Sequence, residues 1–239
     1  MRLPAVTAIL VFISVSLLPA LPASPAPPQQ PAQPAQPAPQ ERPRLFPPQD
    51  LGLIEAPDRV EWQKPELIMD KLRIADGSRV GEIGAGGGWF TILLARRVGP
   101  NGIVWAEDVQ APMVDFIGRR VQRENLLWVK PLIGTQTDPR LPSSLDTVLI
   151  AFGYSEMEEP ETLFANAARS LKRDGCFGVV DFLPGNGGPG PEPKDRVAPE
   201  EVIATAKAAG LTLLAKDPIP PFVYLLVFGK ATSRCAPSP

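Results

Sequence analysis

The chain has 239 residues, a formal net charge of −2, 31 prolines, two cysteines and no histidine. The near-neutral charge and the lack of a basic run argue against a dedicated nucleic-acid surface. A metal site is not expected either, because histidines and clustered cysteines are absent from the sequence. The expected ligand is therefore a small molecule.

Residues 1–23 have the composition of a targeting segment. Arg2 supplies a short positive region, residues 5–18 are almost wholly apolar, and small residues follow. The apolar run is shorter than the about 20 residues of a typical membrane span. The pattern predicts a signal peptide or an uncleaved anchor that associates with a membrane through residues 5–18. The protein is then expected to be exported, to the periplasm or the medium, or to be N-terminally membrane-anchored.

Residues 24–44 are rich in proline, alanine and glutamine, which predicts a disordered linker. Residues 45–232 are expected to form one globular domain, and residues 233–239 a flexible tail. About 190 residues are enough to bury a sizeable core. Cys176 starts a predicted strand and Cys235 lies in the tail, and their spacing leaves open whether they form a disulfide or stay free thiols.

Apolar periodicity in the globular part predicts alternating strands and helices. The strands are expected at residues 79–83, 103–108, 126–132, 147–152, 176–182, 211–216 and 223–229, and the helices at residues 66–72, 89–98, 111–123, 160–171 and 199–209. Such alternation predicts an α/β, Rossmann-like fold with a mostly parallel seven-stranded sheet and helices on both faces, the last strand being antiparallel. Ligands bind at the carboxyl edge of such a sheet.

The stretch VGEIGAGGGWFT, residues 80–91, is a strand that runs into a glycine-rich turn and then a helix. Glycine tolerates positive φ and lets a ligand approach the main chain, and the helix start presents free N–H groups. The dinucleotide fingerprint requires glycine where Trp89 stands, which disfavours NAD. The carboxylate of Glu82 at this edge favours a ligand that carries a positive charge.

Asp108 ends the second predicted strand, where a carboxylate can accept hydrogen bonds from both hydroxyls of a ribose. Strand alternation is expected to send its neighbour Glu107 to the opposite face. Glu82 and Asp108 together therefore suit a cationic nucleoside.

The motifs resemble, in order, those of class I S-adenosylmethionine-dependent methyltransferases. The stretches that carry the resemblance are RVGEIGAGGGWFT (79–91), GIVWAEDVQAPMVDF (102–116), SLDTVLIAFGYSEMEEP (144–160), LKRDGCFGVVDF (171–182) and EEVIATAKAAGLTLL (200–214). With its WQKP arm, the chain is most similar to small predicted bacterial methyltransferases with an export-like N-terminus. The resemblance covers residues 59–230.

The resemblance implies S-adenosylmethionine as cofactor and gives a role to each matching residue. Glu82 would face the methionine ammonium group and Asp108 would hold the ribose. The other implied cofactor contacts are Gly84, Ala85, Gly86 and Gly88 along the loop, Val109 against the adenine, and Thr135 and Gln136 near the adenine edge. Phe152, Gly153 and Tyr154 would line the opening towards the methyl acceptor.

Relatives commonly carry a histidine after the tyrosine of the fourth-strand motif, but here Ser155 follows Tyr154. A general base, if one is used, would be Glu156, a tyrosine such as Tyr154, or water. Glu156 with Glu158 and Glu159 is more typical of a solvated acidic cluster. We expect methyl transfer to an unidentified small or medium-sized acceptor. The alternatives are an exported non-catalytic Rossmann-like module that binds a nucleoside or a partner, and an NAD-dependent oxidoreductase.

Overall fold

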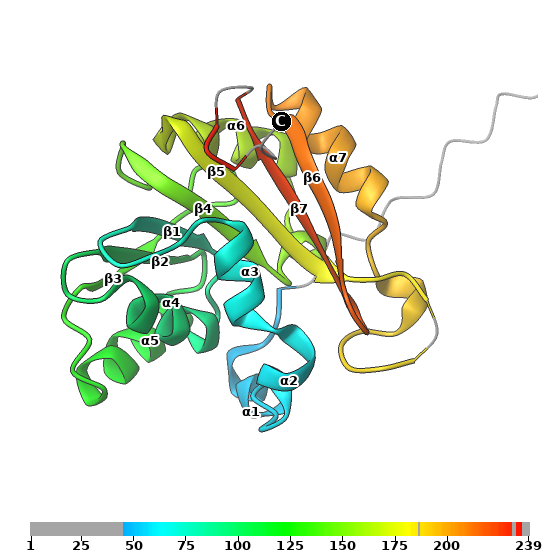
Figure 1. The fold of residues 1–239 in the computed structure, drawn as a ribbon. Helices are drawn as coiled ribbons and strands as arrows, with labels where there is room; N and C mark the ends of the chain where they lie inside the picture. Colours follow the sequence, from blue (N-terminus) through cyan, green and yellow to red (C-terminus); the bar gives the residue numbers. More distant parts are fainter. Residues whose placement is uncertain (1–44, 186, 231–232, 236–239) are drawn as a thin grey trace, which may run out of the picture. The chain divides into compact units, whose positions relative to one another are not determined.

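The structure is a computed structural model that describes residues 45–185, 187–230 and 233–235 (Figure 1). The expected targeting segment and linker lie outside the described residues. Within the described ranges, no helix is long and apolar enough to cross a membrane.

A seven-stranded sheet forms the centre of the described part, with strand order β3-β2-β1-β4-β5-β7-β6 (Figure 1). Its strands are β1 (Arg79–Ile83), β2 (Ile103–Asp108), β3 (Val129–Ile133), β4 (Leu145–Ala151), β5 (Leu171–Phe182), β6 (Thr212–Ile219) and β7 (Val223–Gly229). Strands β1 to β5 pair in parallel, and β7 is antiparallel to both of its neighbours. The predicted Rossmann-like sheet with an antiparallel last strand is confirmed.

Helices cover both faces of the sheet. One apolar cluster packs α3 (Pro65–Lys71), α4 (Trp89–Val98) and α5 (Ala111–Arg123) on the sheet. A second cluster packs α6 (Pro160–Ser170) and α7 (Pro199–Ala208). In β4 the side chain of Leu149 belongs to the first cluster, whereas those of Val148 and Ile150 belong to the second, as the alternation of a strand requires.

The chain before α3 is helical, where the sequence predicted only an arm. It forms η1 (Pro48–Asp50), α1 (Leu51–Ile54) and α2 (Arg59–Gln63). Lys64, with φ 50°, turns the chain between α2 and α3, and Pro65 starts α3. Helices this short carry too few apolar repeats for periodicity to predict them.

Other differences from the predicted elements have local causes. Leu67 was expected on the buried face of α3 but is 39% exposed. The buried face is formed by Ile68, Met69 and Leu72 instead. Strand β5 begins earlier than expected, at Leu171, which pairs with β4 before a register shift. Strand β6 continues through Pro218, which an edge strand tolerates.

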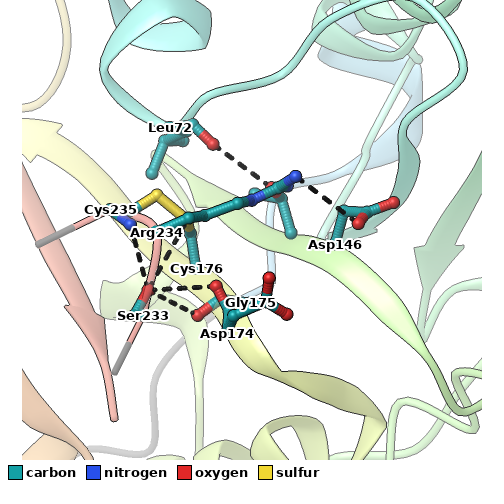
Figure 2. The surroundings of a disulfide bond; sticks show 9 residues. Leu72, Asp146, Asp174, Gly175, Cys176, Ser233, Arg234 and Cys235 are labelled. Carbon is teal, nitrogen blue, oxygen red and sulfur yellow. Dashed lines mark hydrogen bonds and ion pairs between the residues drawn. A yellow bond between two sulfur atoms is a disulfide. The ribbon is translucent and has the colours of Figure 1, made fainter. Parts of the chain in front are cut away.

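The expected flexible tail is wrong for residues 233–235, which are fastened to β5. Cys235 forms a disulfide with Cys176, with their Cα atoms 5.8 Å apart (Figure 2). The Ser233 hydroxyl donates to the carbonyl oxygen of Gly175 at 2.9 Å. Arg234 Nη1 lies 3.5 Å from Asp146 Oδ1. Ser233 and Cys235 are buried, so this end of the chain is part of the domain.

The disulfide predicts a redox-dependent stability. The two cysteines are 59 residues apart, and closing a loop of that length is worth about 4 kcal/mol in the chain-entropy model. Reduction should therefore lower the melting temperature by roughly 10 °C. Thermal unfolding with and without dithiothreitol measures this difference.

The matched control is the Cys176→Ala/Cys235→Ala variant, whose melting temperature should not respond to the reductant. A wild-type melting temperature that the reductant leaves unchanged would contradict a stabilising disulfide.

Candidate functional site

A cavity of about 1140 Å³ lies at the carboxyl edge of the sheet. The last residues of four parallel strands line it, with the chain before α3 and residues 189–191. The predicted cofactor-binding residues that line the cavity are Glu82, Gly84, Ala85, Gly86, Asp108, Val109, Thr135 and Gln136. Gly88 is not among the lining residues. The role of each residue towards a ligand stays a prediction.

The glycine-rich loop between β1 and α4 uses left-handed backbone conformations. Gly84, Gly86 and Gly88 have φ values of 70°, 55° and 76°. A Cβ atom at Gly84 or Gly86 would meet no atom within 4 Å, so the space beside these residues is open. Glycine is required there by the backbone angle, and the open space leaves room for a ligand against the main chain. Gly88 caps the start of α4 instead.

Asp108 joins the end of β2 to this loop. Its Oδ2 atom accepts a hydrogen bond from the Gly86 N–H and its Oδ1 atom from the Gln110 N–H, both at 2.9 Å. Burial raises the pKa of the Asp108 carboxyl. Each carboxylate oxygen has a second lone pair, so the group can still accept hydrogen bonds from two hydroxyls of a ligand.

Glu107 also lines the cavity, so alternation does not remove it from the ligand edge as expected. Its carboxyl fills the space beside Gly134, where a Cβ atom would collide with it. Burial, and next the charge of Asp108, raise the pKa of Glu107 to about 8. Alternation sets the side on which a side chain starts, but a long side chain at a strand end can turn towards the edge.

Glu82 is almost completely buried, with 2% of its surface exposed. Its Oε2 atom accepts a hydrogen bond from the Thr91 hydroxyl at 2.5 Å. Burial raises the pKa of Glu82 to about 8, although the Thr91 hydrogen bond and the positive charge of Arg59 oppose the shift. Binding a cation here would favour the ionised form of Glu82.

Arg59 in α2 brings a positive charge into the same cavity, although no sequence motif predicted it as a site residue. Its guanidinium carbon lies 4.2 Å from the centre of the Trp89 ring. Burial lowers the pKa of Arg59 to about 10, and the charges of Glu55 and Glu82 oppose this effect, so Arg59 is protonated at neutral pH. A site that holds both Glu82 and Arg59 suits a zwitterionic amino-acid group. The one sequence signal was a positively charged residue three positions before Trp62, the first residue of the WQKP arm.

The first described residues cross the cavity and are bound at two points. The Phe46 N–H donates to Glu156 Oε2 at 2.7 Å, and Gln110 Nε2 donates to the Phe46 carbonyl oxygen at 3.0 Å. Glu156 is therefore half-buried and holds the main chain, whereas Glu158 and Glu159 are exposed as expected of an acidic cluster. Burial raises the pKa of Glu156.

Arg120 of α5 fastens α1 over the glycine loop. Its Nη1 atom donates to Glu55 Oε1 at 2.5 Å and to the Gly87 carbonyl oxygen at 3.1 Å. Residues 45–63 are thus a wall of the cavity that three distant parts of the chain hold in place.

Tyr154 was expected at the opening of the cavity as a candidate base, and the structure contradicts this placement. It is 4% exposed, its ring packs on Phe164, and its hydroxyl lies 2.7 Å from Thr205 Oγ1. The residue lies in η2 (Tyr154–Glu156), where the chain turns after β4 and directs this ring towards α6 and α7. Phe152 and Gly153 do line the cavity.

Three aromatic rings from distant segments form one wall of the cavity, which we call the aromatic cluster: Trp62, Phe152 and Phe182. Ring centres are 4.8 Å apart for Phe152 and Phe182, and 5.8 Å apart for Trp62 and Phe182. Phe152 has φ 63°, a strained conformation for a residue with a side chain. Such strain persists only where surrounding contacts fix the position, as they do at this wall.

The glycine-proline loop after β5 closes the cavity beside this cluster. Arg196 organises it by donating hydrogen bonds to carbonyl oxygens of the loop, those of Leu183, Gly187, Pro189 and Pro191. The Arg196 guanidinium also lies 5.4 Å from the centre of the Phe182 ring. These four hydrogen bonds fix the described residues of the loop beside the cavity.

Glu82 predicts a pH-dependent stability. From about pH 5 to pH 8 the unfolded chain has lost the proton that the folded chain keeps, so raising the pH favours unfolding through this group. Glu82→Gln keeps the shape without the charge. The variant should gain in stability relative to wild type from pH 5 to pH 8, by more than about 1 kcal/mol, since one pKa unit is worth about 1.4 kcal/mol. Urea unfolding at both pH values measures this gain.

Glu158→Gln is the matched control, because Glu158 is exposed and should give no such difference. An equal stability difference for Glu82→Gln at both pH values would show that Glu82 ionises normally in the folded chain.

Residues 80–175 match the family model described as "Methyltransferase domain". One curated relative is a demethylmenaquinone methyltransferase from Lactobacillus johnsonii, 30% identical over 124 residues that cover 50% of this chain and 49% of the relative. Another is a nocamycin O-methyltransferase from Saccharothrix syringae, 28% identical over 61% of this chain and 56% of the relative. The chain spans about half the length of the curated relatives it matches.

The fold agrees with these matches. The crystal structure of a SAM-dependent methyltransferase from Aquifex aeolicus superposes with a TM-score of 0.73 at 24% identity, covering 77% of this chain and 98% of that one. The matched range contains the glycine loop and Asp108, which belong to the stretches that carry the sequence resemblance. Residues 80–175 are therefore similar to a methyltransferase domain, and the chain has the Rossmann-like fold of S-adenosylmethionine-dependent methyltransferases.

Proposed function

We propose that this protein transfers a methyl group from S-adenosylmethionine to a small-molecule acceptor. The observation that carries the proposal is the meeting of Glu82, Asp108 and the open side of Gly84 and Gly86 at one edge of a single cavity. The buried acid suits the ammonium group, the second acid suits the ribose hydroxyls, and the loop leaves the main chain accessible.

The cofactor supplies a methyl group on a positively charged sulfur. The residues of this chain bind and orient it: Glu82 with Arg59 would hold the zwitterionic end and Asp108 the ribose. The wall formed by residues 45–63 would keep water from the reacting groups. Alignment of the acceptor with the methyl group can supply much of the rate, so the site needs positioning before it needs a strong base.

The acceptor binds, in this proposal, between the aromatic cluster and the strand ends. A cavity of about 1140 Å³ leaves space for an acceptor beside the cofactor. The names of the two relatives described above refer to demethylmenaquinone and nocamycin. They support an organic small molecule as the acceptor class.

Titration of the full-length protein with S-adenosylmethionine by calorimetry tests the cofactor half of the proposal. Asp108→Ala should weaken this binding at least tenfold, about 1.4 kcal/mol, because charge-assisted hydrogen bonds to the ribose are lost. Asp115→Ala, which removes an exposed acid of α5, is the matched control and should bind like wild type.

Absence of binding to the wild-type protein would overturn the proposed function, and binding of NAD in its place would favour the oxidoreductase. Binding of S-adenosylmethionine with no formation of S-adenosylhomocysteine, across a screen of phenol, amine and quinol acceptors, would favour the non-catalytic module.

We also propose that the domain acts outside the cytoplasm, exported or held by an N-terminal membrane anchor. The apolar residues 5–18 support this location. The disulfide between Cys176 and Cys235 supports it independently, because disulfides persist mainly in oxidising compartments.

A fusion of residues 1–45 to a phosphatase that is active only outside the cytoplasm tests the location. The fusion should be active, and Leu10→Arg with Ile13→Arg, which interrupt the apolar run, should abolish the activity. An inactive wild-type fusion would contradict the proposed location.

A further inference from the structure

Asp181 is a buried acid of the cavity that neither the sequence motifs nor the cofactor explains. It lies at the carboxyl end of β5, lines the cavity and is 5% exposed. Its Oδ1 atom accepts a hydrogen bond from the N–H of Phe182 at 2.7 Å. Its Oδ2 atom has no hydrogen-bond partner among the described residues. A buried acceptor without a donor is costly, so such an atom indicates a missing partner.

The surroundings of Asp181 are aromatic. Phe182 follows it directly, and Phe152 is held beside this strand end because its N–H donates to the Val180 carbonyl oxygen at 2.8 Å. Trp62 reaches the same wall from α2, with its ring centre 6.1 Å from that of Phe152. Flat rings and a buried carboxylate that line the same cavity favour a planar molecule that carries a hydrogen-bond donor.

Gln63 adds a second acceptor of the same kind. It is 1% exposed, lines the cavity, and its Oε1 atom has no hydrogen-bond partner among the residues that the structure describes. The two unpaired acceptors, Asp181 Oδ2 and Gln63 Oε1, can be satisfied only by hydrogen-bond donors. A ligand that carries only acceptors would leave both atoms without a hydrogen bond.

We propose that Asp181 accepts the hydrogen bond of an O–H or N–H group on a planar, largely apolar methyl acceptor stacked on the aromatic cluster, and takes the proton of that group during methyl transfer. This inference rests on the proposed methyltransferase function, which it extends to an acceptor class and a base. In the step, the acceptor heteroatom forms a bond to the methyl carbon as the carbon–sulfur bond breaks. The sulfur keeps that electron pair and becomes neutral, and the heteroatom's proton passes to the Asp181 carboxylate and then to water.

The charges that face Asp181 suit a base. Burial, together with the charge of Glu156 from η2, raises the pKa of Asp181 to about 7, although the hydrogen bond from the Phe182 N–H and the charge of Arg196 oppose the shift. From β7, Tyr224 pairs with Asp181 across the sheet and is buried, with its hydroxyl directed to the Val197 carbonyl oxygen. A group with a pKa near the working pH combines a populated basic form with useful proton affinity.

The other two candidate bases are engaged elsewhere. The Glu156 carboxylate accepts a hydrogen bond from the Phe46 N–H. The Tyr154 hydroxyl is hydrogen-bonded to the Thr205 hydroxyl outside the cavity. Among the acidic groups described at the cavity, Asp181 is the one that joins a partner-free oxygen to the aromatic cluster.

The test uses the full-length protein saturated with S-adenosylhomocysteine, and two probes of equal ring system. 2-Naphthol carries an O–H donor and 2-methoxynaphthalene does not. Calorimetry should show 2-naphthol binding at least tenfold more tightly than 2-methoxynaphthalene. The affinity for 2-naphthol should also rise with pH through about pH 7, as Asp181 loses its proton and becomes a better acceptor.

Asp181→Asn should remove both the preference and the pH dependence, because the Phe182 N–H occupies the oxygen of the new amide and turns its NH₂ group towards the ligand. Asp174→Asn makes the same chemical change at the exposed end of β5 and should behave like wild type. Both variants should bind S-adenosylhomocysteine as wild type does, which keeps this test separate from the cofactor site.

Equal affinities for the two probes, no binding of either, or a preference that persists in Asp181→Asn would each overturn the assignment. Failure of the proposed function has a different signature, because S-adenosylhomocysteine and S-adenosylmethionine would then not bind at all.

Discussion

The site depends on the desolvation of acidic groups at one edge of the sheet. Parallel strands end together, so β1, β2 and β5 bring Glu82, Glu107, Asp108 and Asp181 to a single cavity. Burial raises the pKa of each carboxyl, and the charge of Asp108 adds to the effect for Glu82 and Glu107. The folded chain tolerates this arrangement through protonation, backbone N–H groups and the charge of Arg59. A cationic ligand would stabilise the ionised carboxylates. The free energy that their burial costs the folded chain would then be recovered on binding and would increase the affinity for the ligand.

The wall formed by residues 45–63 completes this edge, and its position is set by contacts that span the chain. Phe46 is bound to Glu156, 110 residues away, and Glu55 is bound to Arg120, 65 residues away. Arg59, Trp62 and Gln63 reach the cavity from the same wall. Without it the carboxyl edge would be open to water, the burial of Glu82 and Asp181 would be lost, and their pKa values would fall towards those of exposed acids.

The sequence predicts the features that depend on neighbouring residues better than those that depend on residues far away in the chain. Strand β1, the glycine loop and helix α4 are set by neighbouring residues, and their predicted bounds agree with the structure at Arg79–Ile83 and Trp89–Val98. The placement of single side chains depends on distant partners: Tyr154 turns away because Thr205 and Phe164 receive it, and Glu107 stays at the edge because Gly134 leaves room. Rules based on the spacing of nearby residues cannot identify these partners, because they are far away along the chain or act through the space that they leave. Asp181 was predicted only as part of the strand at residues 176–182, since burial without a hydrogen-bond partner has no signature in sequence.

The two halves of the cavity therefore differ in how they are encoded. The cofactor half is one supersecondary unit, from β1 to the end of β2, whose glycines and acids stand at fixed spacing, so a motif identifies it. The acceptor half joins Trp62 from α2, Phe152 after β4, Asp181 and Phe182 from β5 and the loop held by Arg196. The side chains of these segments can change without altering the fold, because the strands pair through the backbone, as β5 does with β7 at Asp181 and Phe182. In the proposed function the side chains of this wall select the acceptor, and a base placed there, such as Asp181, serves the chemistry of the acceptor rather than the binding of the cofactor.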